Sequence, residues 1–374
     1  MFVVFLGGNM YEKKKVFTKQ DTACIKGIAI ILMFIHHLFA FPDRIKADST
    51  YISIFMIDSN SIEYYMGGFG RLCVAIFMCL SGYGLYKAYG DKQISNSIIL
   101  GRLRKIYIEY WKIFLIFIPI GMYLNNGQIN KDISTIILNL LAVNITYNGE
   151  WWFLTPYLFT VCILPAIFKF MGNKERTIYL DIFYVITIAI VFTFGITKII
   201  NYPNSIFSDF ANTLYWKILS QFFTILPSFL MGIIVAKYDL FSLYMQSSKS
   251  QLRLVIESSL ILFGVVAMRI QLGESWDYIY APIFAISVVA LVGNIKYIYH
   301  ILCKLGERST GMWLIHSFYC YMYLQWLVYY PRNSILILLW LILLSYISSI
   351  IIDKFWEKIR MIYNNVYKWE NEKI

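Results

Sequence analysis

The stretch KGIAIILMFIH at residues 26–36 places a basic residue, Lys26, ten positions before a histidine, His36, with only apolar residues and glycine between them. Ten residues of helix at ~1.5 Å each would put His36 about 15 Å from Lys26, near the middle of a ~30 Å hydrocarbon layer. An ionisable side chain at that depth is costly, which favours a functional role facing a bundle interior or a water-filled cavity. A buried histidine that donates one hydrogen bond to a neighbouring helix is the alternative.

Composition places the whole chain in the same class. Apolar residues make up 59% of the 374 residues and charged residues only 15%, whereas soluble proteins carry about 25% charged residues. The sequence therefore predicts an integral membrane protein. A formal charge of +11 would point to nucleic acid in a soluble chain, but here the cations sort by membrane side, so no nucleic-acid partner is expected and membrane lipids are.

Ten apolar stretches have about the ~20 residues that a membrane-spanning helix needs. Five are nearly free of charge, at residues 151–168, 218–236, 278–295, 309–331 and 333–352. Five more are interrupted or flanked by charge, at residues 24–41, 68–89, 106–124, 177–198 and 252–271. We expect an all-α, polytopic helix bundle of about ten transmembrane helices.

The distribution of cations predicts the orientation of this bundle. With a cytoplasmic N-terminus, Lys112 falls within a span and 24 of the 33 Lys and Arg residues lie on the inner side. The eight on the outer side are Arg44, Lys46, Arg71, Lys131, Lys198, Lys217, Arg269 and Arg332. Such a bias favours cytoplasmic termini. We expect one membrane domain over residues 1–374, with cytoplasmic segments at residues 1–23 and 353–374.

Cations and polar residues near the predicted spans are candidate site residues. Arg102, Arg104 and Lys105 lie within four residues on the inner side, and arginine forks suit phosphate, although ordinary topological anchoring would also explain the cluster. Arg71, near the outer face, would either reach lipid headgroups or bind an anionic group in an outward cavity. Ser81 and Tyr83, within LSGY at residues 80–83, offer hydroxyl groups but also suit close helix packing.

Two further histidines lie in predicted spans. His316 falls inside the span at residues 309–331, where a structural role competes with a functional one. His37 projects ~100° around the helix from His36, so we expect it to pack against another helix. The sequence contains no metal-ligand spacing, P-loop, dinucleotide fingerprint or G-x-S-x-G elbow, so we predict no metal and no nucleotide hydrolysis. A membrane-embedded base near inner cations suits transfer of an activated group from a phosphate-bearing donor.

Five motifs resemble, in order, those of the acyltransferase 3 family of membrane acyltransferases. They are KGIAIILMFIH at residues 26–36, GRLCVAIF at 70–77 followed by LSGY at 80–83, RLRK at 102–105, WFL at 152–154 with Tyr157 and Pro165, and GERS at 306–309 followed by WLIH at 313–316.

This resemblance implies a ten-helix bundle that moves an acyl group, usually acetyl, from cytoplasmic acyl-CoA to a hydroxyl of a cell-surface polysaccharide or lipid-linked glycan. His36 would be the general base, and Arg102, Arg104 and Lys105 would hold the phosphates of the donor. Lys26, Arg71, Ser81, Tyr83, Trp152 and His316 would line the substrate cavity. No cofactor would be tightly bound, because acetyl-CoA or another acyl-CoA is the donor substrate.

The chain departs from the family pattern in three places. Lys26 stands where the family commonly has arginine. No carboxylate follows Trp152 until Glu175, and Glu150 precedes the motif, so the sequence names no orienting partner for His36. The soluble domain appended to some members has no counterpart here, which points to a stand-alone form.

Two other functions fit a many-spanning bundle with buried histidine. One is a transporter or exporter of a lipid-linked sugar, although the prolines show no paired, repeat-related interruptions. The other is a non-catalytic subunit that works with a polysaccharide synthase. Richness in Ile, Lys, Asn and Tyr suggests a low-GC bacterium. We therefore expect a multi-pass protein of the bacterial plasma membrane.

The predicted orientation can be tested by labelling. A cysteine at Ser95 should resist a membrane-impermeant thiol reagent in intact cells, whereas a cysteine at Ser49 should react, because the two positions lie on opposite sides of the predicted bundle. Inverted labelling would place the basic cluster at residues 102–105 outside, away from any pool of acyl-CoA.

Overall fold

The computed structural model describes residues 16–90, 92–124, 129–203, 206–248 and 250–371, and helices dominate them. The one sheet in this part of the chain pairs two short antiparallel strands, β1 (Met56–Ile57) and β2 (Asn60–Ser61). In the labels, η marks 3-10 helices, except that η3 and η5 are π-helical. The helices are α1 (Lys19–Phe39), η1 (Pro42–Arg44), α2 (Ile62–Gly70), α3 (Leu72–Tyr89), α4 (Asn96–Tyr123), α5 (Ile133–Leu140), η2 (Gly149–Trp151), α6 (Leu154–Cys162), α7 (Leu164–Met171), α8 (Ile178–Ile188), η3 (Ala189–Ile196), α9 (Thr197–Ile200), α10 (Ser208–Ala211), α11 (Leu214–Lys237), α12 (Leu240–Ser247), α13 (Gln251–Leu272), η4 (Glu274–Trp276), α14 (Asp277–Val292), α15 (Lys296–Glu307), α16 (Ser309–Ser317), η5 (Phe318–Met322), α17 (Gln325–Tyr329) and α18 (Ser334–Asn371).

The predicted all-α polytopic fold is confirmed, with a difference in the number of spans. In the described residues, eight helices are long and apolar enough to cross a membrane, or up to nine if the bent pair of α6 and α7 counts as one span. That pair bends by 63° because Pro165, in the first turn of α7, lacks the N–H that would continue a helix. The predicted span at residues 309–331 is divided among α16, η5 and α17. The structure thus supports eight or nine spans where about ten were predicted.

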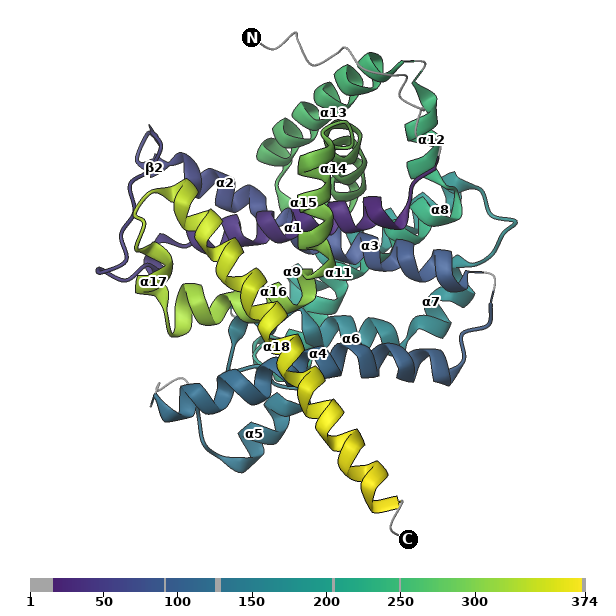
Figure 1. The fold of residues 1–374 in the computed structure, drawn as a ribbon. Helices are drawn as coiled ribbons and strands as arrows, with labels where there is room; N and C mark the ends of the chain where they lie inside the picture. Colours follow the sequence, from purple (N-terminus) through teal and green to yellow (C-terminus); the bar gives the residue numbers. More distant parts are fainter. Residues whose placement is uncertain (1–15, 91, 125–128, 204–205, 249, 372–374) are drawn as a thin grey trace.

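Helix α1 begins at a capping box and occupies the centre of the bundle. The side chain of Thr18 accepts a hydrogen bond from the backbone N–H of Asp21, whose carboxylate accepts from the N–H of Thr18 at 2.8 Å, a pairing that satisfies two otherwise unpaired donors. Buried apolar residues line α1 along its length. It contacts α15, α2, α3, α14, α16 and α18. In Figure 1 it crosses the middle of the molecule with α3 beside it, and α18 runs diagonally across the view.

Glycines allow the helices around α1 to approach closely. A Cβ at Gly27 of α1 would overlap the carbonyl oxygen of Leu302 in α15, and one at Gly306 of α15 would overlap that of Ala23 in α1. Gly82 of α3 and Gly232 of α11 interlock in the same way, against Phe229 and Cys79. Without a hydrophobic driving force between helices in lipid, such close backbone packing stabilises their association.

Glycines also allow α2 to pack closely against the end of α1. A Cβ at Gly67 would lie 2.6 Å from the backbone nitrogen of Ala40, and one at Gly70 would overlap the carbonyl oxygen of Leu32. The backbone of α2 therefore touches the last turns of α1, where His36 lies. His36 is in the final turn of α1, about 4.5 Å of helix rise from its end.

The labelling test of orientation needs a different outer position. Ser49 is buried, with 1% of its surface exposed, so a cysteine there would resist the reagent on either side of the membrane. Ala47, in the same connection, is exposed and replaces it. Ser95 is exposed at the N-terminus of α4 and remains suitable.

The glycine crossing of α3 and α11 generates a stability prediction. Gly82→Ala should destabilise the bundle by about 1–3 kcal/mol because the added methyl group overlaps backbone, which cannot move as a side-chain tip can. Gly84→Ala, two residues along the same helix with nothing within 4 Å of the added Cβ, should leave stability unchanged or slightly raised. Thermal unfolding of both variants in lipid nanodiscs checks this, and equal melting temperatures would contradict the close packing.

Candidate functional site

A cavity of about 630 Å³ extends beside α1. Its walls come from α1, the start of α3, η2 with the beginning of α6, and α16. Of the predicted site residues, five line it: Lys26, His36, Arg71, Ser81 and Trp152. Because these residues are spread over the chain from α1 to α6, the fold brings together much of the predicted site.

The two ends of the cavity differ in chemistry. At one end lie Lys26, Ser81, Tyr157 and the residues that begin α16. At the other end lie the charged and titratable residues His36, His37, Arg44, Arg71, Glu150 and Glu274. Lys26 and His36 both face this space from α1, about 15 Å apart along the helix, so the cavity follows much of the length of a spanning helix.

His36 is oriented by a backbone carbonyl. Its Nδ1 lies 2.8 Å from the carbonyl oxygen of Gly67 in α2. A carbonyl oxygen only accepts hydrogen bonds, so a neutral His36 carries its proton on Nδ1, and its Nε2 keeps a free lone pair. The charges of Arg71, Glu150 and Glu274 act on the ring. The orienting partner that the sequence could not name is therefore the peptide group of Gly67.

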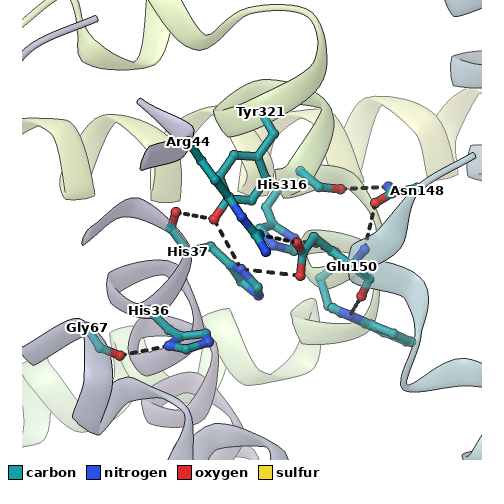
Figure 2. Close-up of polar contacts among 10 residues, drawn as sticks. His36, His37, Arg44, Gly67, Asn148, Glu150, His316 and Tyr321 are labelled. Atoms are coloured by element: carbon teal, nitrogen blue, oxygen red, sulfur yellow. Dashed lines mark hydrogen bonds and ion pairs between the residues drawn. The ribbon is translucent and has the colours of Figure 1, made fainter. Parts of the chain in front are cut away.

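His37 belongs to a cluster around Glu150 (Figure 2). Nδ1 of His37 lies 3.4 Å from Oε2 of Glu150, and the guanidinium of Arg44 donates to Oε1 of Glu150 at 2.8 Å. The hydroxyl of Tyr321 donates to the carbonyl oxygen of His37 and lies 3.4 Å from its Nδ1. The prediction that His37 only packs against another helix is incomplete, because its ring also contacts a carboxylate.

Glu150 is held in place beside a cation. Its side chain is 14% exposed. Partial burial acts to lower the pKa of Arg44, but the contacts with Tyr321 and Glu150 outweigh burial and raise that pKa above its ordinary value, so the guanidinium remains a cation beside the carboxylate. Asn148 fixes the loop before η2 by donating to the hydroxyl of Ser317 at 2.7 Å, and Trp151 donates to the carbonyl of Leu314 at 2.9 Å.

His316 lies behind this cluster and does not line the cavity. It is fully buried, its ring is 4.8 Å from that of His37, and its Nδ1 is 2.5 Å from the carbonyl oxygen of Trp313. Its Nε2 has no hydrogen-bond partner in the described part of the chain. The structure thus places His316 against His37 as a packing neighbour.

Arg71 and Trp152 also border the cavity. The guanidinium of Arg71 forms an ion pair with Glu274 of η4, so Arg71 has a protein partner as well as access to the cavity. Trp152 follows η2 directly, and its ring packs edge-on against Phe153. Both residues also border a second cavity.

The basic cluster of residues 102–105 lies on helix α4, inside the helix that begins at Asn96. Arg102 is half-buried, donates to the hydroxyl of Tyr89 at 3.3 Å, and interacts electrostatically with Lys26 and Tyr157, which line the cavity. Arg104 and Lys105 are exposed and do not line it. Only Arg102 of the three therefore adjoins the Lys26 end directly.

Tyr83 is the predicted site residue that the fold places elsewhere. Its ring packs against Phe17 and Phe241, with centroid separations of 5.3 and 5.4 Å, and it does not line the cavity. Tyr83 is two residues from Ser81, and on a helix that spacing turns the two side chains to different faces. The packing role that the sequence also allowed is the one observed.

A family model described as an acyltransferase domain, of the acyltransferase 3 type, matches residues 23–354. No curated protein matches the chain. No solved structure matches it.

Proposed function

The chain belongs to the acyltransferase 3 family, and from this membership we propose that it transfers an acyl group, most simply acetyl, from acyl-CoA to a hydroxyl of a glycan at the cell surface. The observation that carries the proposal is the free Nε2 of His36, set by the contact between its Nδ1 and Gly67 at 2.8 Å, on the wall of a cavity that also reaches Lys26.

The proposed reaction requires one proton acceptor. Nε2 of His36 takes the proton of the acceptor hydroxyl while the oxygen attacks the thioester carbonyl, a carbon–oxygen bond forms, and the carbon–sulfur bond breaks. The CoA thiolate leaves and receives the proton back from His36, so the products are an ester and free CoA. A neutral imidazole with an accessible lone pair suits this task, and proton transfer of this kind typically contributes about 10²–10⁴ in rate.

The distribution of charge supports separate ends for the two substrates. Lys26 and Arg102 supply cations at one end of the cavity, and we assign the phosphates of acyl-CoA to that end, with Arg104 and Lys105 available to phosphates that extend beyond it. The predicted orientation places this end on the cytoplasmic side, where acyl-CoA is made. The acceptor hydroxyl would then meet the thioester near His36.

The Glu150 cluster acts on this chemistry through position and charge. Glu150 interacts electrostatically with His36 and contacts His37 directly, so its negative charge favours the imidazolium that forms when His36 takes a proton. We therefore assign Glu150, Arg44 and His37 as positioning residues. His36 alone is proposed as the catalytic base.

A comparison of the two adjacent histidines tests the base. His36→Gln should lower the rate of acyl transfer at least 100-fold, because glutamine cannot accept the proton. His37→Gln should keep activity within about tenfold, because the glutamine amide can still donate to Glu150. Even complete loss of that hydrogen bond would cost only about 1 kcal/mol.

The measurement is the release of CoA and the formation of ester by each purified variant, after its fold is checked by thermal unfolding. Parent-like transfer by His36→Gln, or loss confined to His37→Gln, would contradict the assignment. A folded parent protein that transports a lipid-linked sugar and never releases CoA would instead support the transporter.

Binding of CoA tests the donor end. Lys26→Ala and Arg102→Ala should each weaken binding by about 1–3 kcal/mol, because each removes a charged partner of phosphate. Arg104→Ala and Lys105→Ala should have smaller effects, since these exposed side chains adjoin water. Lys358→Ala, which removes an exposed cation from α18, is the matched control. Unaltered affinity in the Lys26/Arg102 double variant, measured by titration calorimetry, would reduce these cations to topological anchors.

A further inference from the structure

A second cavity of about 240 Å³ adjoins the one that contains His36. The two cavities share Arg71, Val74, Trp152 and Glu274 in their linings. The ion pair of Arg71 and Glu274 and the indole of Trp152 therefore form the boundary between them. We refer to the second space as the side cavity; its other walls are α11, the start of α14, and Thr193 of the π-helical segment η3.

The hydroxyl of Tyr278 in the side cavity lacks a partner. Tyr278 is 4% exposed, and its hydroxyl has no hydrogen bond to any described residue. A buried hydroxyl without a partner is unfavourable, and buried polar groups are normally paired with protein, water or ligand. This group is therefore available to a ligand that carries its own hydrogen-bonding groups.

The remaining lining has the composition of a site for an uncharged polyol. Hydroxyl groups come from Thr193, Thr224, Ser228 and Ser275, and carboxylates from Glu274 and Asp277. These groups can donate to and accept from sugar hydroxyls, while Trp152 offers an apolar ring face.

The charge of the lining argues against an anionic ligand. Arg71 is the one cation among the lining residues, against the two carboxylates of Glu274 and Asp277, and Arg71 already pairs with Glu274. Asp277 is in turn paired with the buried Arg269, so the described lining of the side cavity holds no cation that is free to bind the phosphates of acyl-CoA, whereas Lys26 and Arg102 at the other end of the main cavity can attract them. The two cavities thus suit different substrates.

The side cavity is also connected mechanically to His36. Asp277 accepts two hydrogen bonds from Arg269, at 2.7 and 3.0 Å, and Arg269 donates to the carbonyl oxygen of Gly68 at 3.2 Å. Gly68 follows Gly67, whose carbonyl orients His36. A ligand that contacts Asp277 therefore lies on the same chain of contacts as the proposed base.

One wall of the side cavity belongs to a helix that faces lipid. In the continuous helix Ile178–Ile200, which includes η3, only 12% of the most apolar stretch of 18 residues is buried inside the protein. Ile190 and Val191 of this helix expose 47% and 44% of their surfaces. Sugars do not partition into hydrocarbon, so a sugar that reaches this wall laterally needs an apolar carrier.

We infer that the side cavity is the acceptor subsite and that it binds the uncharged sugar headgroup of an amphiphile whose apolar chain lies in lipid beside η3 and α11. This assignment rests on the proposed acyl transfer for its role, but binding can be measured without that reaction.

Photolabelling tests the occupant. The full chain in lipid nanodiscs is exposed to octyl β-D-glucoside with a diazirine in its alkyl chain, below the micelle threshold, and to the corresponding octyl alcohol without sugar. We expect the glucoside to label residues of η3 or α11, with competition from unlabelled octyl β-D-glucoside and none from octanol. Equal labelling by the sugar-free probe, or labelling confined to other helices, would overturn the subsite.

Two substitutions sharpen the test. Tyr278→Phe should weaken labelling and raise the KM for the glucoside about 3- to 10-fold, as expected for one lost hydrogen bond, with Thr224→Val as a second variant that should act in the same direction. Tyr280→Phe is the matched control, because its hydroxyl is also buried without a described partner yet it lines neither cavity. Equal affinity of the parent and both tyrosine-to-phenylalanine variants would overturn the role of the Tyr278 hydroxyl.

The donor reaction separates this inference from the proposed function. Slow hydrolysis of acetyl-CoA by water, measured without glucoside, should be unchanged by Tyr280→Phe, because Tyr280 lines neither cavity. Specific labelling in a parent protein that neither hydrolyses acetyl-CoA nor releases CoA would retain the sugar site and refute the acyl transfer. Acyl transfer with no glucoside-specific labelling would retain the proposed function and refute the sugar site.

Discussion

The contact between Nδ1 of His36 and the carbonyl oxygen of Gly67, at 2.8 Å, is the interaction on which the site depends. It exists because Gly67 and Gly70 lack side chains where α2 crosses the last turns of α1. It also decides the chemistry of the histidine, since a carbonyl oxygen requires the proton on Nδ1 and leaves Nε2 as a base. A larger residue at either glycine would separate the helices and release the ring, so close helix packing and the protonation of His36 are one constraint.

Around this contact, charge is divided between the two ends of the cavity. Lys26 and Arg102 give one end a positive field, and Glu150, with Arg44 and His37 against it, gives the other end a fixed carboxylate. In the proposed reaction, an anionic donor and a polyhydroxyl acceptor would therefore approach His36 from different directions. The low dielectric of a membrane interior strengthens such fields, so in the proposed reaction a few charged residues would direct the two substrates to different ends of the cavity.

The local sequence pattern was enough to predict the helical membrane fold, because the length of an apolar stretch is a property of one helix. It also selected five residues that line one cavity. The partners of His36 and His37 could not be predicted, since Gly67 and Glu150 reach them from distant segments through tertiary packing. Tyr83 does not line the cavity because the face of α3 on which a side chain lies decides whether it reaches the cavity. Closeness to Ser81 in the sequence does not decide this. The number of spans differed where Pro165 and the π-helical turn of η5 interrupt apolar stretches that read as continuous.

The most direct measurement is the protonation of the His36 ring. The chain contains four histidines, so protein labelled with ¹⁵N in histidine and reconstituted in lipid gives few imidazole signals, and the pair that disappears in His36→Gln belongs to His36. At alkaline pH, where imidazoles are neutral, we expect solid-state NMR to show a protonated Nδ1 and an unprotonated Nε2 for that residue. A proton on Nε2 would mean that Gly67 does not accept from the ring, and His36 could not act as the base proposed.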